Sequence, residues 1–378
     1  MFQIIKQSDT SLARLGEMTT NHGIFKTPVF MPPGTQATVK ALGPDDLNSI
    51  GVEIILVNAF HLHLRPGEDF LQTFGGIHRF MGWSKPILSD SGGFQAWSFH
   101  HKANLSRISE EGVEFVSPYD GTRDFFTPEK ALEAEHKIGS DIIMTFDECA
   151  PDNEDKEYAQ KALERTNRWA ERSLRKHQEL SHREISMGQN PPLLFGIIQG
   201  GIFSDLRKEG AKFLASLPFD GFALGGETIG YNMKRTLELL EELKPLLPSD
   251  KPLYTMGLGA NPFDVLDVVK RGVDMFDCVN PARIARHGGL YNGELIIQKE
   301  GVFFQSEFKN GILKLANSRF KNDNSPIDNF CDCYTCRTFS RAYLRHLYFC
   351  QEPLYLRLAT LHNLRFMMRL VQALRDNI

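Results

Sequence analysis

The stretch LLFGIIQGG, residues 193 to 201, is a short apolar run that ends in a glutamine and two glycines. A run of this length, bounded by polar residues and glycine, is typical of a strand buried on both faces of a parallel sheet. Three later stretches share the pattern: GFALGG (221 to 226), PLYTMGLG (252 to 259) and MFDCVNP (275 to 281). Four earlier ones share it too: PVFMPPGT (28 to 35), IILVNAF (54 to 60), PILSDSGG (86 to 93) and DIIMTFDE (141 to 148). The sequence therefore predicts eight buried strands.

Segments with helical periodicity separate most of these strands. Residues 156 to 176 place five small or apolar side chains on one helical face, namely Ala162, Thr166, Trp169, Ala170 and Ser173. Residues 231 to 245, which contain LELLEEL, have the same period. Strands that alternate with helices predict an α/β fold, a (β/α)8 TIM barrel. The alternative is a doubly wound open sheet, but no glycine fingerprint follows the first strand.

Two insertions interrupt the predicted barrel. Residues 99 to 140 contain GVEFVSPYDGTRDFF, which predicts a hairpin around Asp120-Gly121 after the third strand. A second insertion covers about 300 to 350 and carries a cysteine-rich loop. We therefore expect a barrel with an N-terminal extension over 1–299, a metal-binding insertion over 300–362, and a C-terminal helix over 363–378 that packs back on the barrel.

Composition narrows the protein class. With 378 residues, 42% of them hydrophobic and 24% charged, the chain has no signature of disorder, collagen or coiled coil. No segment approaches the ~18 apolar residues that span a bilayer, so we expect a cytoplasmic protein without a membrane partner. The formal net charge is −4, yet residues 331–378 contain seven arginines against three acidic residues. This local excess of positive charge is compatible with an anionic partner at the C-terminal end, but a helix with a solvated arginine face is the more common explanation of such a pattern.

The loop CDCYTC, residues 331 to 336, holds three of the six cysteines. Thiols in a cytosolic protein seldom form structural disulfides, so such a cluster indicates a metal site. Cys331, Cys333 and Cys336 supply three ligands of a tetrahedral zinc ion, and His362 is the preferred fourth, with His346 and Cys350 as alternatives. Four protein ligands leave no open position, so one structural zinc ion is expected and the chemistry lies elsewhere.

Acidic residues end several of the predicted strands. Asp90 ends the third strand, Asp147 and Glu148 the fourth and Asp277 the eighth, while Gln199 closes the fifth. In a barrel of this kind the C-terminal strand ends surround the active site. Two carboxylates beside the anomeric carbon of a sugar can divide the work, one as nucleophile and the other as acid and base.

Six sequence motifs resemble those of tRNA-guanine transglycosylase of the bacterial type, and the resemblance covers nearly the whole chain. They are DSGGFQ (90 to 95), FDEC (146 to 149), GIIQGG (196 to 201), MGLG (256 to 259), FDCVNPARIAR (276 to 286) and the Cys-x-Cys-x2-Cys-x25-His pattern. The resemblance implies a zinc-containing (β/α)8 barrel that works as a homodimer. It also implies exchange of the wobble guanine of a tRNA anticodon stem-loop for a free 7-deazaguanine base, in queuosine modification, through a covalent enzyme–RNA intermediate.

The resemblance assigns roles to individual residues. It implies that Asp277 is the nucleophile and Asp90 the general acid and base, acting on a nucleotide everted into the pocket. It places the base against a further set of residues: Ser91, Gly92, Gly93, Phe94, Asp147, Gln199, Gly226, Glu227 and Met256. The flanking RNA would meet two segments, Gly257, Leu258, Gly259, Ala260, Asn261, Pro262 and Phe263, and then Ala282, Arg283, Ile284, Ala285 and Arg286.

The sequence departs from the family pattern at several of these positions. Phe94 replaces a tyrosine, so stacking on the base is kept while a hydroxyl is absent. Ala282 replaces a threonine and removes one polar group. In GGETIGYN, residues 225 to 232, Glu227 replaces a leucine and Tyr231 replaces the glutamate that answers the aminomethyl group of 7-aminomethyl-7-deazaguanine. We expect either that Glu227 reaches this ammonium group or that the loop admits a bulkier base such as queuine, with altered base choice favoured.

Two other function classes are compatible with part of the sequence. The HLH motif at 61 to 63, together with Asp277, fits a metal-dependent amidohydrolase barrel, but later strand ends offer Gln199 and Gly226 instead of histidines. His61 and His63 are then packed or hydrogen-bonded loop residues. A noncatalytic RNA-binding subunit is disfavoured because Asp90 and Asp277 are both present.

Overall fold

The computed structural model describes residues 1–95, 106–298 and 301–378. Eight parallel strands form its central sheet: β4 (Val29–Met31), β5 (Ile55–Asn58), β6 (Ile87–Asp90), β10 (Ile142–Met144), β11 (Leu193–Ile198), β12 (Gly221–Leu224), β13 (Leu253–Thr255) and β14 (Met275–Asp277). Each lies within one predicted stretch. The last strand, β14, pairs with the first, β4, and backbone bonds from Gly34 to Leu56 (2.6 Å) and from Leu56 to Pro32 (3.2 Å) link β4 to β5. The predicted barrel is confirmed.

The strands are apolar throughout because both of their faces are buried. In β11, for example, Phe195 and Ile197 point into the barrel cluster, while Leu194 and Ile198 belong to the cluster that packs against the outer helices. This alternation holds along the sheet, which explains why the strands lack the polar residues of a half-exposed sheet.

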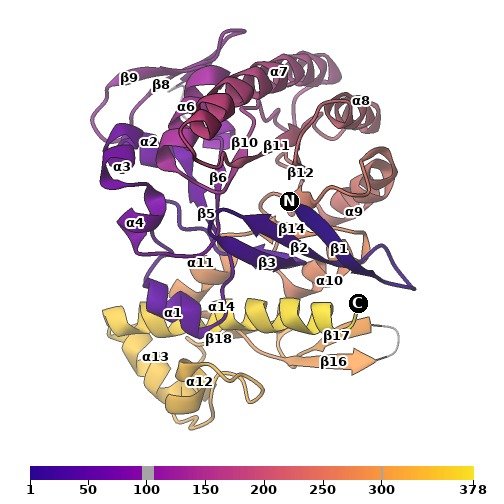
Figure 1. Cartoon of the computed structure of the whole chain (residues 1–378). Helices are drawn as coiled ribbons and strands as arrows, with labels where there is room; N and C mark the ends of the chain where they lie inside the picture. The colour runs from indigo at the N-terminus through magenta and orange to yellow at the C-terminus, as the bar shows by residue number, and fades with distance from the viewer. Residues whose placement is uncertain (96–105, 299–300) are drawn as a thin grey trace.

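Helices cover the outside of the barrel (Figure 1). They are α1 (Pro44–Ser49), α2 (Ala59–Leu64), α3 (Glu68–Phe74), α4 (Ile77–Met81), α6 (Pro128–Ile138), α7 (Lys156–Ser186), α8 (Ser204–Ala215), α9 (Met233–Leu243), α10 (Pro262–Lys270) and α11 (Asn280–Arg286). The helix predicted at 156 to 176 continues to Ser186, and its predicted face is buried. Its N-terminus is capped by Asp155, whose side chain accepts a hydrogen bond from the backbone N–H of Tyr158 (2.8 Å). None of the described helices is both long enough and apolar enough to cross a membrane.

A three-stranded antiparallel sheet covers the N-terminal end of the barrel. It comprises β1 (Phe2–Gln7), β2 (Arg14–Thr20) and β3 (Gly23–Thr27), and its strands lie in front of the barrel in Figure 1. Met18 and Phe25 belong to the cluster inside the barrel. Arg14 makes a buried ion pair (2.6 Å) with Asp274, which immediately precedes β14. Because this end is closed, the opposite end, where the strands finish, is the one open to a substrate.

The insertion after β6 contains the predicted hairpin. Strands β8 (Val113–Val116) and β9 (Arg123–Phe126) pair around Asp120-Gly121, as expected, and a third strand, β7 (Ser106–Ile108), joins them. The part of the predicted insertion at 99–105 lies outside the described residues.

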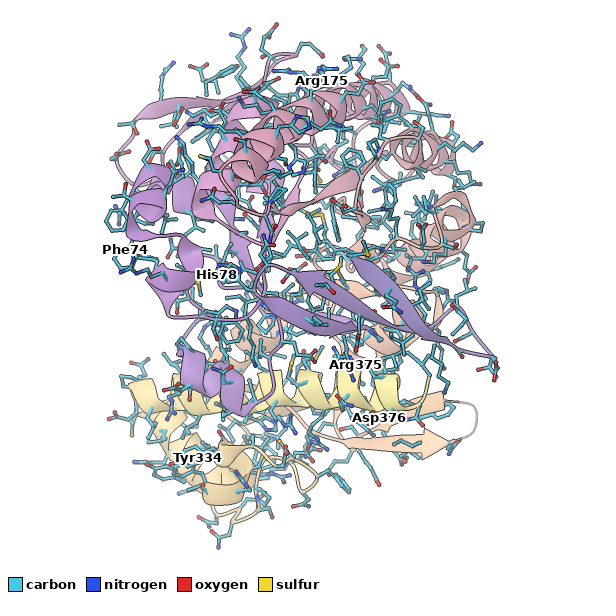
Figure 2. All side chains as sticks on the ribbon, in the orientation of Figure 1. Phe74, His78, Arg175, Tyr334, Arg375 and Asp376 are labelled. Atoms are coloured by element: carbon cyan, nitrogen blue, oxygen red, sulfur yellow. The ribbon has the colours of Figure 1, made fainter. Side chains whose placement is uncertain are left out.

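The C-terminal region forms small sheets and three helices. Its strands are β15 (Gly289–Tyr291), β16 (Glu294–Gln298), β17 (Gly301–Gln305) and β18 (Ile312–Lys314), and its helices are α12 (Tyr334–Thr338), α13 (Arg341–Phe349) and α14 (Pro353–Asp376). The division predicted at 362 and 363 falls within α14, and the one at 299 and 300 lies outside the described residues. Near the end of α14, Arg375 donates to the carbonyl of Pro28 (2.8 Å) and pairs with Glu53, which ties the helix to the barrel (Figure 2).

Candidate active site and metal centre

A cavity of about 430 Å³ lies at the C-terminal ends of the barrel strands. Both predicted catalytic residues, Asp90 and Asp277, line it. So do all of the predicted base contacts: Ser91, Gly92, Gly93, Phe94, Asp147, Gln199, Gly226, Glu227 and Met256. These residues come from the ends of β6 and of β10 to β14, so barrel closure is what brings them together.

Asp90, the last residue of β6, is held by its neighbour strand. Its Oδ1 accepts a hydrogen bond from the backbone N–H of Ala59 (3.1 Å), and its Oδ2 accepts one from the side chain of Asn58 at the end of β5. Burial raises the pKa of Asp90 to about 7, and the negative charges of Asp277 and Asp147 also raise it. A pKa in this range is the one that a general acid and base working near neutral pH needs.

Asp277, the last residue of β14, receives two hydrogen bonds on one oxygen. The Tyr254 hydroxyl (2.6 Å) and the backbone N–H of Gly257 (2.9 Å) both donate to Oδ1. No hydrogen bond to Oδ2 is present among the described residues. Burial raises the pKa of Asp277, whereas hydrogen bonds from Gly257, from Tyr254 and from the backbone of Asp277 itself lower it. The arrangement leaves Oδ2 as the oxygen with free lone pairs.

Asp147 follows β10 and forms the polar wall of the cavity. Gln199 donates to its Oδ2 (2.6 Å), and the Ser91 hydroxyl donates to its Oδ1 (3.3 Å). Burial raises the pKa of Asp147 to about 6. The amide oxygen of Gln199 is buried and has no hydrogen-bond partner among the described residues, so it is an acceptor available to a ligand.

Two glycines allow the backbone to approach this wall. A Cβ atom on Gly93 would lie 2.3 Å from Oδ1 of Asp147, and Gly92 has φ +82°, a conformation that L side chains rarely adopt. The next residue, Phe94, is 48% exposed, so its ring is accessible at the cavity.

Arg207 is a residue that sequence reasoning missed. It belongs to α8, yet it is fully buried beneath the loop that follows β12. It donates to three carbonyl oxygens, those of Ile198 (2.9 Å), Gly201 (2.8 Å) and Gly225 (2.6 Å). A Cβ on Gly226 would lie 2.3 Å from Nη2. Arg207 therefore fixes the backbone that carries the Gly225-Gly226 pair. On the sequence it is one cation among several on an amphipathic helix.

The altered loop after β12 borders the same cavity. The carboxylate of Glu227 accepts a hydrogen bond from the backbone N–H of Asp152 (3.3 Å), which links two loops of the cavity rim. Tyr231 also lines the cavity and is 83% exposed. Where the family pattern has a glutamate, this chain therefore has the aromatic ring of Tyr231, at the open edge of the cavity.

The two predicted RNA-contact segments lie beside the mouth of the cavity. The first follows β13 and begins α10, and the second forms most of α11, which follows β14. Gly257, Phe263 and Arg283 are exposed and Arg286 is partly exposed. Other members are buried: Leu258, Gly259, Pro262, Ala282 and Ala285. These buried residues pack beneath the exposed ones and do not reach the surface.

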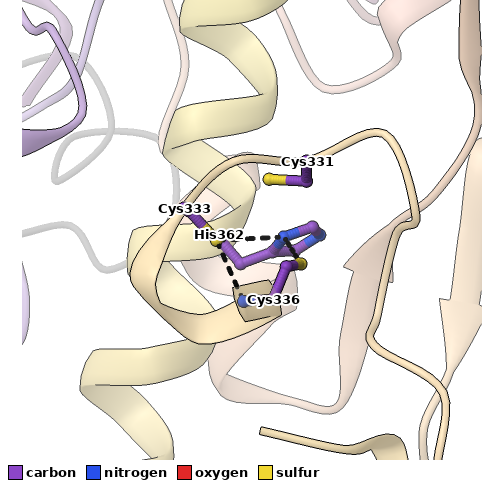
Figure 3. A group of neighbouring side chains, drawn as sticks. All are labelled: Cys331, Cys333, Cys336 and His362. Carbon is purple, nitrogen blue, oxygen red and sulfur yellow. Dashed lines mark hydrogen bonds between the residues drawn. The ribbon is translucent and has the colours of Figure 1, made fainter. Parts of the chain in front are cut away.

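A buried metal-binding cluster lies between the CDCYTC loop and α14 (Figure 3). The ligand atoms of Cys331, Cys333, Cys336 and His362 all lie within 4.8 Å of one another. His362 Nδ1 is 3.2 Å from the sulfur of Cys336 and 3.8 Å from that of Cys333. Its Nε2 lies 2.7 Å from the carbonyl oxygen of Tyr291, to which it donates, so the lone pair of Nδ1 faces the sulfurs and is available to a metal ion. The cluster can hold a metal ion, and among the sequence candidates His362 is the fourth member.

The competing ligand candidates point elsewhere. Cys350 contacts His346 (3.7 Å between the sulfur and Nδ1) and is exposed. His63 is held between Glu68 and Asp124, with 2.7 Å from a ring nitrogen to each carboxylate. This double pairing removes His63 from any metal site at the strand ends.

A second group of potential ligands lies at the closed end of the barrel. His22 and His78 each contact Asp141, at 2.9 Å and 3.0 Å. Their rings are stacked, with centroids 3.4 Å apart and an interplanar angle of 14°. Two imidazoles bound to one tetrahedral ion must diverge from each other behind it. The stacked pair therefore indicates two histidines hydrogen-bonded to Asp141 rather than a metal site.

Comparisons with known proteins agree over the whole chain. The family model described as queuine tRNA-ribosyltransferase matches residues 9–378. A protein named queuine tRNA-ribosyltransferase from Desulforamulus reducens is 47% identical over 376 residues, covering 100% of this chain and 94% of that protein. Proteins of the same name from Bacillus licheniformis (46% over 377 residues; 100% and 91%) and Psychrobacter sp. (45% over 368 residues; 97% and 90%) are also similar.

Proposed function

This chain belongs to the queuine tRNA-ribosyltransferase family, and from that premise we propose that Asp277 is the nucleophile of its base exchange and Asp90 the group that carries the proton. The enzyme is a tRNA-guanine transglycosylase, a pentosyltransferase that replaces guanine in tRNA with a 7-deazaguanine base. The amidohydrolase alternative is not favoured.

Asp277 acts as the nucleophile. Its free Oδ2 attacks C1′ of the everted nucleotide, so the bond from C1′ to the guanine nitrogen breaks while a C1′–Oδ2 bond forms. The hydrogen bonds from Tyr254 and Gly257 hold Oδ1 and fix the direction in which Oδ2 faces. The RNA backbone stays intact because only the glycosidic bond is exchanged.

Asp90 carries the proton in both directions. Its raised pKa keeps a population protonated at neutral pH, and this acid donates a proton to the departing guanine. The resulting carboxylate then takes the ring N–H proton of the incoming base, whose nitrogen attacks C1′ and releases Asp277. After the second step, both carboxyl groups are back in their starting states.

The edge of the base meets the polar wall of the cavity. Asp147 and the unpartnered oxygen of Gln199 supply acceptors for the N–H groups of a guanine-like base. The backbone at Gly226, supported by Arg207, supplies a further contact. The observation that carries this proposal is that two carboxylates and a set of base-edge acceptors line one cavity.

Covalent trapping tests the assignment. Protein incubated with a tRNA anticodon stem-loop is expected to form an adduct that survives denaturant, and Asp277→Asn is expected to form none. Asp250→Asn is a suitable control, because Asp250 is exposed in the turn before β13, at the closed end of the barrel, and does not line the cavity. An adduct formed equally well by Asp277→Asn would rule out Asp277 as the nucleophile.

We propose further that base choice is altered. Two observations support this: Tyr231, in place of the family glutamate, is 83% exposed at the edge of the cavity, and Glu227 supplies a carboxylate to the cavity lining. Exchange assays with 7-aminomethyl-7-deazaguanine and with queuine test this, together with Glu227→Leu and Tyr231→Glu variants. Use of the aminomethyl base alone would refute the queuine hypothesis.

The metal centre is proposed to hold one structural zinc ion. Three thiolates and one imidazole nitrogen fit the tetrahedral preference of zinc, and the hydrogen bond from His362 to Tyr291 orients the imidazole. The ion would join the CDCYTC loop to α14. We also propose a homodimer, the free base as second substrate and a cytoplasmic location, where tRNA is found.

A further inference from the structure

The carboxyl groups of the cavity wall are not balanced by a cation in the wall itself. Asp90, Asp147, Asp277 and Glu227 line the cavity, whereas no Lys, Arg or His side chain lines it in the part of the chain that the structure describes. The first chemical step nevertheless adds negative charge to this space. When the bond from C1′ to the base breaks, its electron pair passes to the base, and conjugation spreads part of it to the carbonyl oxygen of the base. A positive group close to that oxygen would favour the step.

Arg207 is a buried cation behind this wall, on α8, which packs against β11 (Figure 1). Its side chain is 0% exposed, and it makes no ion pair with any carboxylate among the described residues. Burial lowers the pKa of Arg207 to about 10, so the guanidinium stays charged at neutral pH. A buried charge without a partner of opposite sign is unfavourable and rare in proteins. This charge is therefore available to an anionic group in the cavity.

The guanidinium of Arg207 is directed at the two peptide units that precede base contacts. Its Nη1 donates to the carbonyl oxygens of Ile198 (2.9 Å) and Gly225 (2.6 Å). These two residues directly precede Gln199 and Gly226 in the chain. The C=O and N–H of a planar trans peptide point in opposite directions. Because Arg207 holds the Gly225 carbonyl from outside the cavity, the N–H of Gly226 points away from Arg207 and toward the cavity.

The N–H of Gly226 is free to donate to a ligand. It makes no hydrogen bond to any residue within the described ranges, and Gly226 lines the cavity. A hydrogen bond to the carbonyl of a peptide polarises the unit, so its N–H becomes a stronger donor. Nη2 of Arg207 also lacks a hydrogen-bond partner among the described residues, and a Cβ on Gly226 would collide with it. The charge thus lies directly beneath the backbone that faces the base.

We propose that Arg207 is a positioning residue for departure of the base: it directs and polarises the Gly226 N–H, and this donor together with the buried charge stabilises the negative charge that develops on the carbonyl oxygen of the leaving base. The proton from Asp90 then neutralises the base. The same contact acts in reverse when the incoming base loses its ring proton to Asp90 and attacks C1′. This inference rests on the proposed function, because it assumes that Asp277 displaces the base.

Single-turnover formation of the covalent adduct, at saturating stem-loop, tests the proposal. Arg207→Gln keeps a hydrogen-bond donor but removes the charge, and it is expected to slow the step roughly tenfold or more, as loss of a group that stabilises developing charge does. Arg207→Lys keeps a charge beneath Gly226 and is expected to slow the step less. Lys208→Met, which removes a surface charge from the same helix, is expected to leave the rate unchanged.

A stem-loop with 6-thioguanine at the exchanged position separates the charge effect from a loss of structure. Sulfur is a weak hydrogen-bond acceptor, so it responds less to the Gly226 N–H than oxygen does. The ratio of the rates with guanine and with 6-thioguanine is measured for each protein. If Arg207 acts through the carbonyl oxygen, this ratio should fall roughly threefold or more in Arg207→Gln relative to the wild-type protein.

Thermal melting verifies that each variant is folded, and Arg207→Met, which is also neutral, replaces Arg207→Gln if the latter does not fold. A neutral variant that reacts at the wild-type rate would overturn the proposal. So would a slower variant whose ratio equals that of the wild-type protein, because Arg207 would then only support the fold. Both outcomes leave the proposed function intact, provided that the wild-type protein forms the adduct. If the wild-type protein forms no adduct, the proposed function fails as well.

Discussion

Tyr254 donates a 2.6 Å hydrogen bond to Oδ1 of Asp277, from a position one strand away in the barrel. The backbone N–H of Gly257 donates to the same oxygen. Both donors thus lie on one side of the carboxylate and stabilise its ionised form, while the other oxygen remains available. These donors oppose the effect of burial, which raises the pKa of Asp277, and they fix the orientation of the proposed nucleophile. This relationship leads to the first prediction.

Tyr254→Phe is expected to slow formation of the covalent adduct about 10- to 100-fold, because a hydrogen bond to a charged group contributes roughly 1.5–3 kcal/mol. Loss of the hydroxyl also raises the pKa of Asp277 further, so the acid limb of the rate profile should move to higher pH. Single-turnover rates across pH measure both effects. An unchanged rate and an unchanged limb would show that the hydroxyl only fills space.

The pKa of Asp90 predicts how the first chemical step depends on pH. Because Asp90 must be protonated to act on the leaving guanine, the rate of adduct formation should fall as pH rises through about 7. Asp90→Asn should remove this limb along with most of the activity. Single-turnover rates of the wild-type protein and of Asp90→Asn across pH measure this dependence.

The ionisation of Asp90 also affects the free energy of unfolding. The pKa of Asp90 is raised from 3.8 to about 7 in the folded protein. The free energy by which protonated Asp90 stabilises the fold, relative to the ionised form, is therefore fully present below about pH 4 and is lost as pH rises through about 7. This loss amounts to at most about 4 kcal/mol. Asn cannot ionise, so the melting temperature of Asp90→Asn relative to the wild-type protein should increase between pH 4 and pH 7.5. A difference that is constant over this range would contradict the assigned pKa.

Arg207→Lys is expected to loosen the base pocket. One ammonium group cannot replace a guanidinium that donates to three carbonyl oxygens, and each buried carbonyl left without a donor costs about 1–3 kcal/mol. We expect a lower melting temperature and a higher KM for the incoming base, with affinity for the stem-loop nearly unchanged. Lys208→Met is the control on the same helix, because Lys208 pairs with Glu242 at the surface (3.1 Å).

Removal of the metal ion is expected to unfold the C-terminal region. Chelation should lower the melting temperature and the RNA affinity, because binding of the ion and folding of the loop are linked. Cys331→Ser should have the same effect in the absence of chelator. Cys350→Ser should have none, because Cys350 is exposed and lies outside the cluster. A chelated protein that keeps its melting temperature and RNA affinity would refute the structural role.

Much of the fold could be predicted from local patterns in the amino-acid sequence. Each predicted strand was found because strands buried on both faces are apolar along their whole length, and the strand-end positions of Asp90 and Asp277 followed from the same runs. The hairpin at Asp120-Gly121 was found through its turn residues. The third strand of that insertion, β7, has no comparable signal, because it is short and pairs only on one side.

The residues that support the site were not predictable in this way. Tyr254 looks like an ordinary core residue of β13, and its hydrogen bond depends on the register between β13 and β14. Asn58 reaches Asp90 because β5 and β6 pair with those two residues opposite each other. Arg207 lies on α8 together with lysines at the surface, so the sequence does not distinguish it from them. It is buried only because it packs beneath the loop that follows β12.

The sequence by itself determined the eight barrel strands, the positions of Asp90 and Asp277 at two strand ends and three of the four clustered metal-ligand candidates, because each of these depends on a short local stretch of residues. Tertiary structure alone decided that His362 completes the cluster, that one oxygen of Asp277 stays free and that Arg207 lies under Gly226. These contacts join segments far apart in sequence, and their geometry is fixed only when the barrel closes and the strand registers are set.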